Sequence, residues 1–416
     1  MEKPYINPFR MQGWIKLMSS AALVASIVTA PFSNAQAQEG SQGNTTIFGS
    51  AEMTFFGNHD FVTGGAGTQP GVILTERATA SISYLNFFGN GLTSTGASDA
   101  GYVDGYVRKY GTGQFIFPTG DNGFLGQFAA SANGTNGAYF HADPTSAVTN
   151  NLFTGTNYPV LPAGGPFATT AKASTVGAVS TIEYWDINGA TTTPITLTWD
   201  TGSDVTTLTG GTLSKLIIVG WNTALSQWVK IPATVNVTSV LGGASTLTAG
   251  SITTNASIVP NTYSVYTLGT QVPDLTPTTD IDGFSFPTAG TSKDFIINLY
   301  EINDVLATGL IRFRITKLSA FNITYPTTSG TSAVFGGTAN ENGNWDFTEN
   351  ASFITITAKA GVTIPANGQA ALGFNITRKP GVASGTAQNI TATIISGSGG
   401  EVFFGNNQVI TTVTAN

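Results

Sequence analysis

The sequence contains no cysteine, two histidines and only 9% charged residues. Without cysteine the chain can form no disulfide framework, thiolate nucleophile or cysteine zinc site. Runs of Ala, Leu, Glu and Lys at helical spacing are also missing, which argues against a helical protein. A hydrophobic content of 41% excludes the composition typical of disordered chains. Stability must come from side chains buried between sheets, and the composition predicts an all-β protein of two or three domains.

Motifs of common enzyme sites are missing as well. The chain has no G-x-S-x-G nucleophile elbow, no phosphate loop and no dinucleotide fingerprint. Glycoside hydrolysis needs two positioned carboxylates, and the sparse acidic residues mark no such pair. We therefore expect a non-catalytic protein that needs no cofactor.

Two short motifs raise the question of a metal. His59 stands beside Asp60, and His141 precedes Asp143 by two residues, a spacing that can bind a metal or orient a base. No third ligand is marked, so structural or surface roles are favoured. Residues 280–283, Asp-Ile-Asp-Gly, start like a calcium loop but lack its spacing and closing glutamate. Metal binding stays open at this point.

The N-terminus carries the pattern of an export signal. Arg10 and Lys16 precede a short apolar run at residues 17–28, and Ala35-Gln36-Ala37 predicts cleavage before Gln38. Removal of residues 1–37 takes away three basic residues and one acidic residue, which leaves 13 against 22 and a net charge of −9. We therefore expect an extracellular or cell-surface protein without a transmembrane segment in its mature chain. Its acidic balance argues against nucleic acid as a partner.

The region after the signal, residues 38–100, is predicted as a short N-terminal β region. Phe55-Phe56-Gly57-Asn58 and Phe87-Phe88-Gly89-Asn90 each end a short apolar strand. The pair indicates a rung-like repeat, although two copies are too few to establish a solenoid. The same strands fit equally well as additions to the sheet of the next domain.

Residues 101–271 are predicted as a β-sandwich domain that opens with a hairpin. Residues 102–110 and 114–117 predict its two strands, and Gly111-Thr112-Gly113 supplies a connection that permits positive φ. Pro118 should end the second strand. The charged residues of the hairpin are interpreted as turn and flanking groups rather than catalysts; they are Asp104, Arg108, Lys109 and Asp121. Further strands are expected at 124–132, 138–142, 179–187, 194–200, 213–221, 227–232 and 262–268.

Tryptophans are the candidate ligand-binding residues of this sandwich. Outward-facing indoles in a row would stack on sugar rings, whereas indoles between the sheets would fill the core. Trp199 alternates with apolar neighbours and is assigned to the core. Trp185, Trp221 and Trp228 are the candidate stacking residues, with core packing as the alternative. Trp221 and Trp228 are also expected to form a packed cross-strand pair.

Residues 272–416 are predicted as a separate immunoglobulin-like β-sandwich. Pro273 and Pro277 flank a polar segment that favours a domain boundary. Beyond it, strands recur every eight to twelve residues, separated by Gly, Asn and Pro. They are expected at 283–286, 293–301, 310–317, 321–325, 344–348, 353–358, 370–377, 388–395 and 408–414.

Several motifs support a family resemblance when they are taken as a set. They are the hairpin at 102–123 with Phe117-Pro118-Thr119-Gly120-Asp121, residues 139–144, Glu183-Tyr184-Trp185-Asp186, and Trp221 with Trp228. Together they resemble a recurrent module of large secreted surface proteins from Bacteroidota. The C-terminal part is similar to CARDB-type and related immunoglobulin-like repeats of bacterial surface proteins. Its matching positions are 273–275, Trp345, 364–368, 399–401 and Asn406-Asn407. No type IX sorting domain is recognised, so the export route beyond the signal stays open.

Two classes of function remain. The first is a non-catalytic structural or adhesive surface protein, and self-assembly into a filament or layer is one form of this role. Its partners would be copies of itself or other surface proteins, because exposed edge strands can complete a neighbour's sheet. The second is a carbohydrate-binding surface module with a polysaccharide partner.

Overall fold

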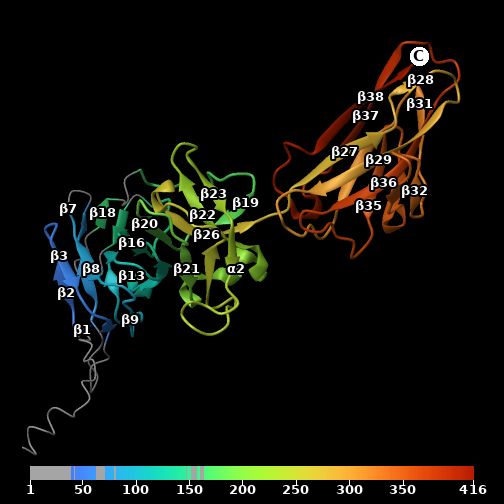
Figure 1. Cartoon of the computed structure of the whole chain (residues 1–416). Helices are drawn as coiled ribbons and strands as arrows, with labels where there is room; N and C mark the ends of the chain where they lie inside the picture. Colours follow the sequence, from blue (N-terminus) through green and yellow to red (C-terminus); the bar gives the residue numbers. More distant parts are fainter. Residues whose placement is uncertain are drawn as a thin grey trace, which may run out of the picture.

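The computed structural model describes residues 39–41, 43–61, 71–78, 81–146, 148–150, 157–159 and 164–416. Nearly all regular structure is β-strand, as the composition predicted, and Figure 1 shows two bodies joined near residue 272. No sheet in the described part of the chain contains strands from both bodies. The predicted signal at 1–37 lies outside the described residues. Among those that are described, no helix is long and apolar enough to cross a membrane.

The first body begins with a three-sided coil in which each side is a stack of parallel strands. We call residues 39–121 the coil segment. Its turns consist of β1 (Glu39–Ser41), β2 (Thr45–Ile47) and β3 (Glu52–Phe55), then β4 (His59–Phe61), β5 (Ile73–Thr75) and β8 (Tyr84–Phe88), then β9 (Ser94–Thr95), β10 (Val103–Asp104) and β11 (Tyr106–Tyr110). The sides pair in the orders β1-β4-β9, β2-β5-β10 and β3-β8-β11. Between β5 and β8 in the second turn, β6 (Arg77–Ala78) and β7 (Ser81–Ile82) form a short antiparallel pair.

Glycine makes one corner of the coil possible. Gly105 separates β10 from β11 and has φ +127°, a conformation that side chains with a Cβ rarely adopt. A Cβ there would lie 2.2 Å from Oγ1 of Thr75 in the turn below. The chain can therefore turn from one side to the next only because this position has no side chain.

The two Phe-Phe-Gly-Asn stretches occupy equivalent places in successive turns. Phe55 pairs with Phe87 in the parallel register of β3 and β8. Both interpretations of the repeat therefore hold, because the strands are rungs of a coil and also the outer strands of the sandwich sheet that follows. The boundary expected between residues 38–100 and 101–271 is wrong in this respect, since one sheet spans it.

That sheet runs from the coil into a sandwich whose two layers enclose the core of the first body. After β3, β8 and β11 come β16 (Thr135–Phe140), β20 (Tyr184–Asn188), β26 (Tyr266–Gln271), β22 (Leu216–Asn222) and β23 (Gln227–Ile231), with β19 (Val176–Val179) beside β26. The facing layer contains β12 (Phe115–Phe117), β15 (Phe128–Ala130), β21 (Thr196–Trp199), β25 (Gly250–Thr254) and β24 (Ala233–Val235). Other elements are β13 (Thr119–Asp121), β14 (Phe124–Leu125), β17 (Val148–Asn150), β18 (Asn157–Pro159) and the short helix α2 (Val205–Thr209).

The hairpin predicted at residues 102–123 is wrong. β11 lies in the first layer between β8 and β16, whereas β12 lies in the facing layer against β15. Gly111, with φ +95°, therefore carries the chain from one side of the coil to another. A Gly-x-Gly connection permits either a hairpin turn or a corner between two sheets, and the local sequence alone does not distinguish these two geometries.

The second body is a two-sheet sandwich around a single apolar core. One sheet has the order β27 (Leu275–Ile281), β29 (Ser292–Glu301), β36 (Gln369–Arg378) and β31 (Phe321–Thr324). The other has β28 (Ser285–Phe286), β38 (Gln408–Ala415), β37 (Thr386–Ile394), β30 (Arg312–Thr316), β35 (Phe353–Ala358) and β34 (Trp345–Glu349). A hairpin of β32 (Gly330–Ser332) and β33 (Thr338–Asn340) lies beside them.

All nine strands predicted in this body are present. The polar segment that suggested a domain boundary, for which no strand was predicted, forms strand β27. Its Pro277 is tolerated because β27 is an edge strand, where a missing backbone N–H breaks no second ladder.

Candidate functional site

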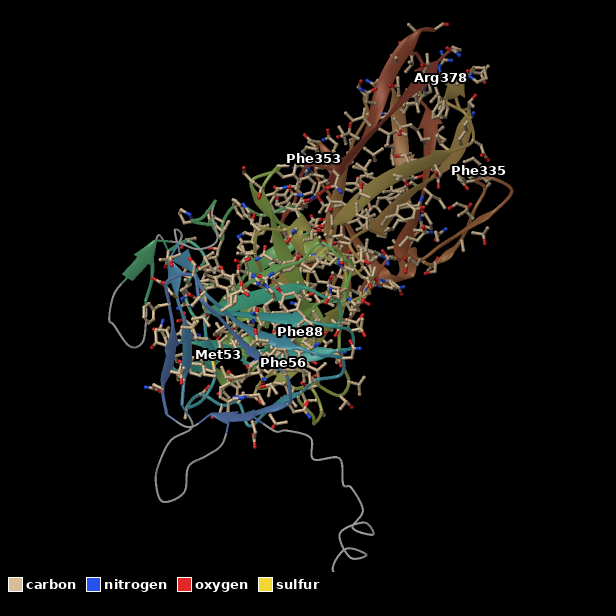
Figure 2. All side chains as sticks on the ribbon, turned by 60° about the vertical axis from the view of Figure 1, so that its left-hand side comes forward. Met53, Phe56, Phe88, Phe335, Phe353 and Arg378 are labelled. Atoms are coloured by element: carbon tan, nitrogen blue, oxygen red, sulfur yellow. The ribbon has the colours of Figure 1, made fainter. Side chains whose placement is uncertain are left out.

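A row of aromatic side chains lies on the outer face of the coil segment. Phe56, Phe88 and Tyr110 follow one another across β3, β8 and β11, with ring centroids 5.9 Å and 5.8 Å apart. Phe56 is 72% exposed and Phe88 is 54% exposed, while Tyr110 is half-buried. Figure 2 shows Phe56 and Phe88 together on this face, with Met53 nearby. We call these three rings the aromatic row.

The sequence forms this row by repeating an aromatic residue before a glycine turn. Asn58 accepts a hydrogen bond from Thr93 N at 3.0 Å, and Asn90 accepts one from Thr112 N at 2.8 Å. Each asparagine thus fixes the turn that follows its aromatic residue to the next turn of the coil. The Phe-Phe-Gly-Asn repeat was the signal for the row, because strand alternation sends the first phenylalanine inward and the second outward.

Charged groups beside the row are held in place. Arg108 donates to Glu52 at 2.8 Å and to Tyr110 Oη at 3.2 Å, and its guanidinium lies 3.7 Å from the centroid of the Tyr84 ring. Asn86 donates to the second oxygen of Glu52 at 2.9 Å. The hydrogen bond from Asn86, together with Arg108, lowers the pKa of Glu52. The row is thus bordered by the ion pair of Arg108 and Glu52, whose side chains are held in place and whose charges offset each other.

Deeper in the same body lies a buried ionic cluster. The Arg77 guanidinium is fully buried, 3.1 Å from an oxygen of Asp104 and 2.5 Å from one of Asp121. It also donates to Tyr139 O at 3.2 Å. Burial disfavours the guanidinium charge, but the two aspartates outweigh this effect and raise its pKa. Burial raises the pKa of Asp104 to about 6 in spite of Arg77.

A hydrogen-bonded chain leads from this cluster towards the surface. Tyr139 Oη donates to Glu183 at 2.8 Å and lies 2.9 Å from Nδ1 of His141. The His141 imidazole stacks on Phe124 at 3.7 Å, and its backbone N–H donates to Asp121 at 3.0 Å. Burial raises the pKa of Glu183 to about 7 and lowers that of His141. The chain joins β13, β16 and β20 across the first body.

The three candidate stacking tryptophans are core residues. Trp185 and Trp228 are completely buried, and Trp221 is 8% exposed. Trp221 and Trp228 form the expected cross-strand pair, with centroids 5.6 Å apart in an edge-to-face arrangement. Their ring faces are covered by protein, so the prediction that they stack on a ligand is wrong. The alternative of packing between the sheets holds for Trp185, whereas Trp221 and Trp228 belong to a second buried cluster, with Phe167, on the other face of the sheet. The exposed rings of this body are phenylalanines instead.

The other residues considered as ligands have structural contacts. His59 is buried, stacked on Phe55 at 4.5 Å, and burial lowers its pKa to about 4. Asp280 accepts a hydrogen bond from Asn298, and both oxygens of Asp282 accept Phe335 N. Among the residues that the structure describes, no group of three His, Cys, Asp or Glu side chains could hold a metal ion.

Hydrogen bonds fix the junction between the two bodies. The Asn303 amide donates to Val272 O at 2.6 Å and to Thr175 O at 3.1 Å, and Lys230 Nζ donates to Asn303 O at 3.0 Å. Asn303 N in turn donates to the buried carboxylate of Glu301 at 2.9 Å. These contacts tie the loop after β29 to strands of the first body.

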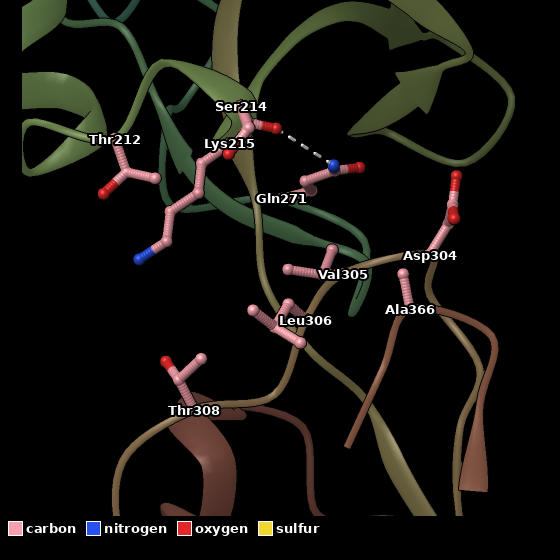
Figure 3. Close-up of a pocket in the computed structure, with 9 residues that line it drawn as sticks. All are labelled: Thr212, Ser214, Lys215, Gln271, Asp304, Val305, Leu306, Thr308 and Ala366. Carbon is pink, nitrogen blue, oxygen red and sulfur yellow. Dashed lines mark hydrogen bonds between the residues drawn. The ribbon is translucent and has the colours of Figure 1, made fainter. Parts of the chain in front are cut away.

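A cavity of about 450 Å³ lies beside this junction (Figure 3). Lys215 and Gln271 line it from the first body, and Asp304 and Leu306 line it from the second. Gln271 donates to Ser214 O at 3.5 Å. The lining brings together one cation, one carboxylate, hydroxyl and amide groups, and apolar side chains.

No protein-family model and no curated protein matches the sequence. Several solved structures of bacterial proteins match parts of the chain. The N-terminal domain of the Streptococcus gordonii adhesin Sgo0707 matches over 73% of this chain and 79% of its own, at 12% identity and a TM-score of 0.25. BcpA, the major pilin subunit of Bacillus cereus, matches over 44% and 64%, at 13% identity and a TM-score of 0.25. A cohesin module from a Clostridium perfringens family 33 glycoside hydrolase covers 34% of this chain and 98% of its own, at 14% identity and a TM-score of 0.23.

At these scores the similarity does not identify a family. The resemblance to a Bacteroidota surface module and to CARDB-type repeats stays a prediction.

Proposed function

We propose that this chain is an extracellular, non-catalytic structural or adhesive protein of the cell surface. The observation that carries the proposal is the aromatic row, because exposed and contiguous apolar rings mark interaction surfaces on folded proteins. Phe56 and Phe88 are the most exposed rings of the row; Phe88 ends β8, and Phe56 directly follows β3, which is paired with β8. The predicted export signal and the acidic mature chain agree with a location outside the cell.

The arrangement of the two bodies supports a structural role. Asn303 and Lys230 hold the junction by hydrogen bonds, so the second body is positioned as an extension of the first (Figure 1). Stacked sheets joined in this way can present the coil segment at a distance from the far end of the second body. We infer that the coil segment is the end that makes contact.

The test compares cells that carry the natural chain with cells that carry Phe56→Ser/Phe88→Ser. We expect the double variant to reach the surface in equal amount, as shown by labelling of intact cells, but to lose most of the attachment or cell–cell association. The matched control is Leu225→Ser/Phe335→Ser, which removes two exposed apolar side chains elsewhere. Equal attachment by all three chains would contradict the proposal, as would a protein that stays inside the cell.

A carbohydrate-binding module is the second candidate. It is favoured by the same rings, because aromatic faces stack on pyranose rings. Binding of the purified chain to a polysaccharide array, abolished by Phe56→Ser/Phe88→Ser, would support it over protein adhesion.

A further inference from the structure

Among the residues that the structure describes, one end of the coil segment carries three strand edges without a partner strand. β1, β2 and β3 are the outermost described strands of their sheets, and together they form the first turn of the coil. Tyr84 N donates to Ala51 O at 3.2 Å. In a parallel ladder alternate residues bond to opposite sides, so Glu52 and Thr54 direct their backbone groups towards the free edge. Such an edge is a template for another strand.

Apolar side chains are exposed at the same end. Phe48, between β2 and β3, is 70% exposed, and Met53 of β3 is 40% exposed. Met53 is in register with Leu85 and Val107, which are completely buried. In the described residues, the Met53 side chain is thus the exposed end of a stack of apolar side chains, one from each turn of the coil. Coils built from stacked repeats need a polar cap at their ends, and this end has apolar side chains instead.

The opposite end of the coil is covered on two of its three sides by the same chain. β11 pairs with β16, and β10 pairs with β13, which pairs with β14. β9 is the last described strand of its sheet, because β12 pairs with β15 and not with β9. A head-to-tail stack of copies is therefore blocked, because the first turn offers three strand edges and this end offers only one. Any pairing between coils must join first turn to first turn.

The geometry points to a second copy of this chain as the partner of the first turn. A sugar would cover rings but leave the backbone edges unpaired, and a single added strand would satisfy one edge of three. Only another coil end presents three edges at the same spacing. A two-fold axis would pair β3 with β3 of the partner in antiparallel orientation and bring the Met53 side chains together. Glu52 is neutralised by Arg108, so this face carries no uncompensated charge on β3.

The inference rests on the proposed surface role and names the partner of its contact face. A two-fold contact uses the same patch on both copies and closes after two chains. It therefore predicts a dimer, and a filament or layer would require another interface.

Sedimentation velocity of the full mature chain over a micromolar concentration range tests the inference. We expect a dimer, and we expect Met53→Lys to raise its dissociation constant at least about tenfold, because the ammonium group would be buried in the contact. Leu225→Lys places the same charge on an exposed apolar position of the same body and should leave the constant unchanged. Circular dichroism and the thermal midpoint of each variant verify that it is folded.

A chain that stays monomeric at every concentration would overturn the inference, and so would a dimer that both lysine variants weaken equally. Species larger than the dimer that become more abundant as the protein concentration rises would overturn the two-fold geometry. These failures are distinct from failure of the proposed function. A monomer on the cell surface contradicts only the inference, whereas a dimer confined inside the cell contradicts only the proposed function.

Discussion

Removal of the Arg77 charge should be the most damaging single change in the first body. The guanidinium is fully buried between Asp104 and Asp121, at 3.1 Å and 2.5 Å. In Arg77→Met a side chain of similar length replaces it, but both fully buried carboxylates lose their cation. Breaking a buried pair in this way costs about 3–5 kcal/mol. In a domain of this size that corresponds to a fall of roughly 6–20 °C in the unfolding midpoint.

The loss should depend on pH, and its sign follows from the carboxylates. Burial raises the pKa of Asp104 to about 6 even beside Arg77. Without the cation this pKa rises further, because nothing offsets desolvation. A raised carboxyl pKa stabilises the fold at low pH, and the stability is lost as pH rises through the folded pKa. The penalty of Arg77→Met should therefore be smaller at pH 5 than at pH 8.

Unfolding by guanidinium chloride, followed by tryptophan fluorescence at pH 5 and pH 8, measures the loss of stability in Arg77→Met. The buried Trp185 and Trp228 report on the first body. The matched control is Arg77→Met/Asp104→Asn/Asp121→Asn, which removes cation and anions together and should lose less than half as much stability. The reasoning would be refuted if Arg77→Met lowered the free energy of unfolding by less than about 1 kcal/mol, or if the triple variant were less stable than Arg77→Met.

Three further predictions concern the coil corner, the buried acids and the junction. Gly105→Ala should lower the free energy of unfolding by several kcal/mol, because the added Cβ would clash with Thr75. Gly123→Ala is the control: it is also at positive φ but has open space, and should lower the free energy of unfolding by about 1 kcal/mol in the same thermal unfolding assay. Burial raises the pKa of Glu183 to about 7, so unfolding free energy should fall as pH rises through 7, and Glu183→Gln should flatten that fall in denaturant titrations at pH 5.5 and 8. Asn303→Ala should leave both sandwiches folded but broaden the distribution of their separations in solution X-ray scattering, and unchanged scattering would show that Val272 and Lys230 contacts do not fix the junction.

Strands were predictable where alternation and local turns specify them. In the second body Phe353–Ala358 and Gln408–Ala415 alternate clearly, and each lies where the sequence placed it. The Trp221–Trp228 pair was predictable because a short turn joins its strands. β27 was missed because Pro277 favours a linker, and only the sheet order shows that the strand lies at an edge.

The coil and the aromatic row were harder to predict for a physical reason. Parallel pairing joins Phe55 to Phe87 and Phe88 to Tyr110 across long stretches of chain, and no local turn marks such a register. The tryptophans drew attention because indoles are good stacking groups, yet their size makes them equally good core residues. Which aromatic residue faces outward is decided by its place in the pleat rather than by its type.

Cysteine labelling on intact cells tests the central claim most directly, because the natural chain has no cysteine. Thr348→Cys lies exposed on β34, and Met53→Cys lies on β3 at the position that would face its own copy across the two-fold axis. The account predicts that a membrane-impermeant thiol reagent labels Thr348→Cys, while Met53→Cys is protected and forms a disulfide-linked dimer on mild oxidation. Absence of label on Thr348→Cys, or full labelling of Met53→Cys without cross-linking, would contradict it.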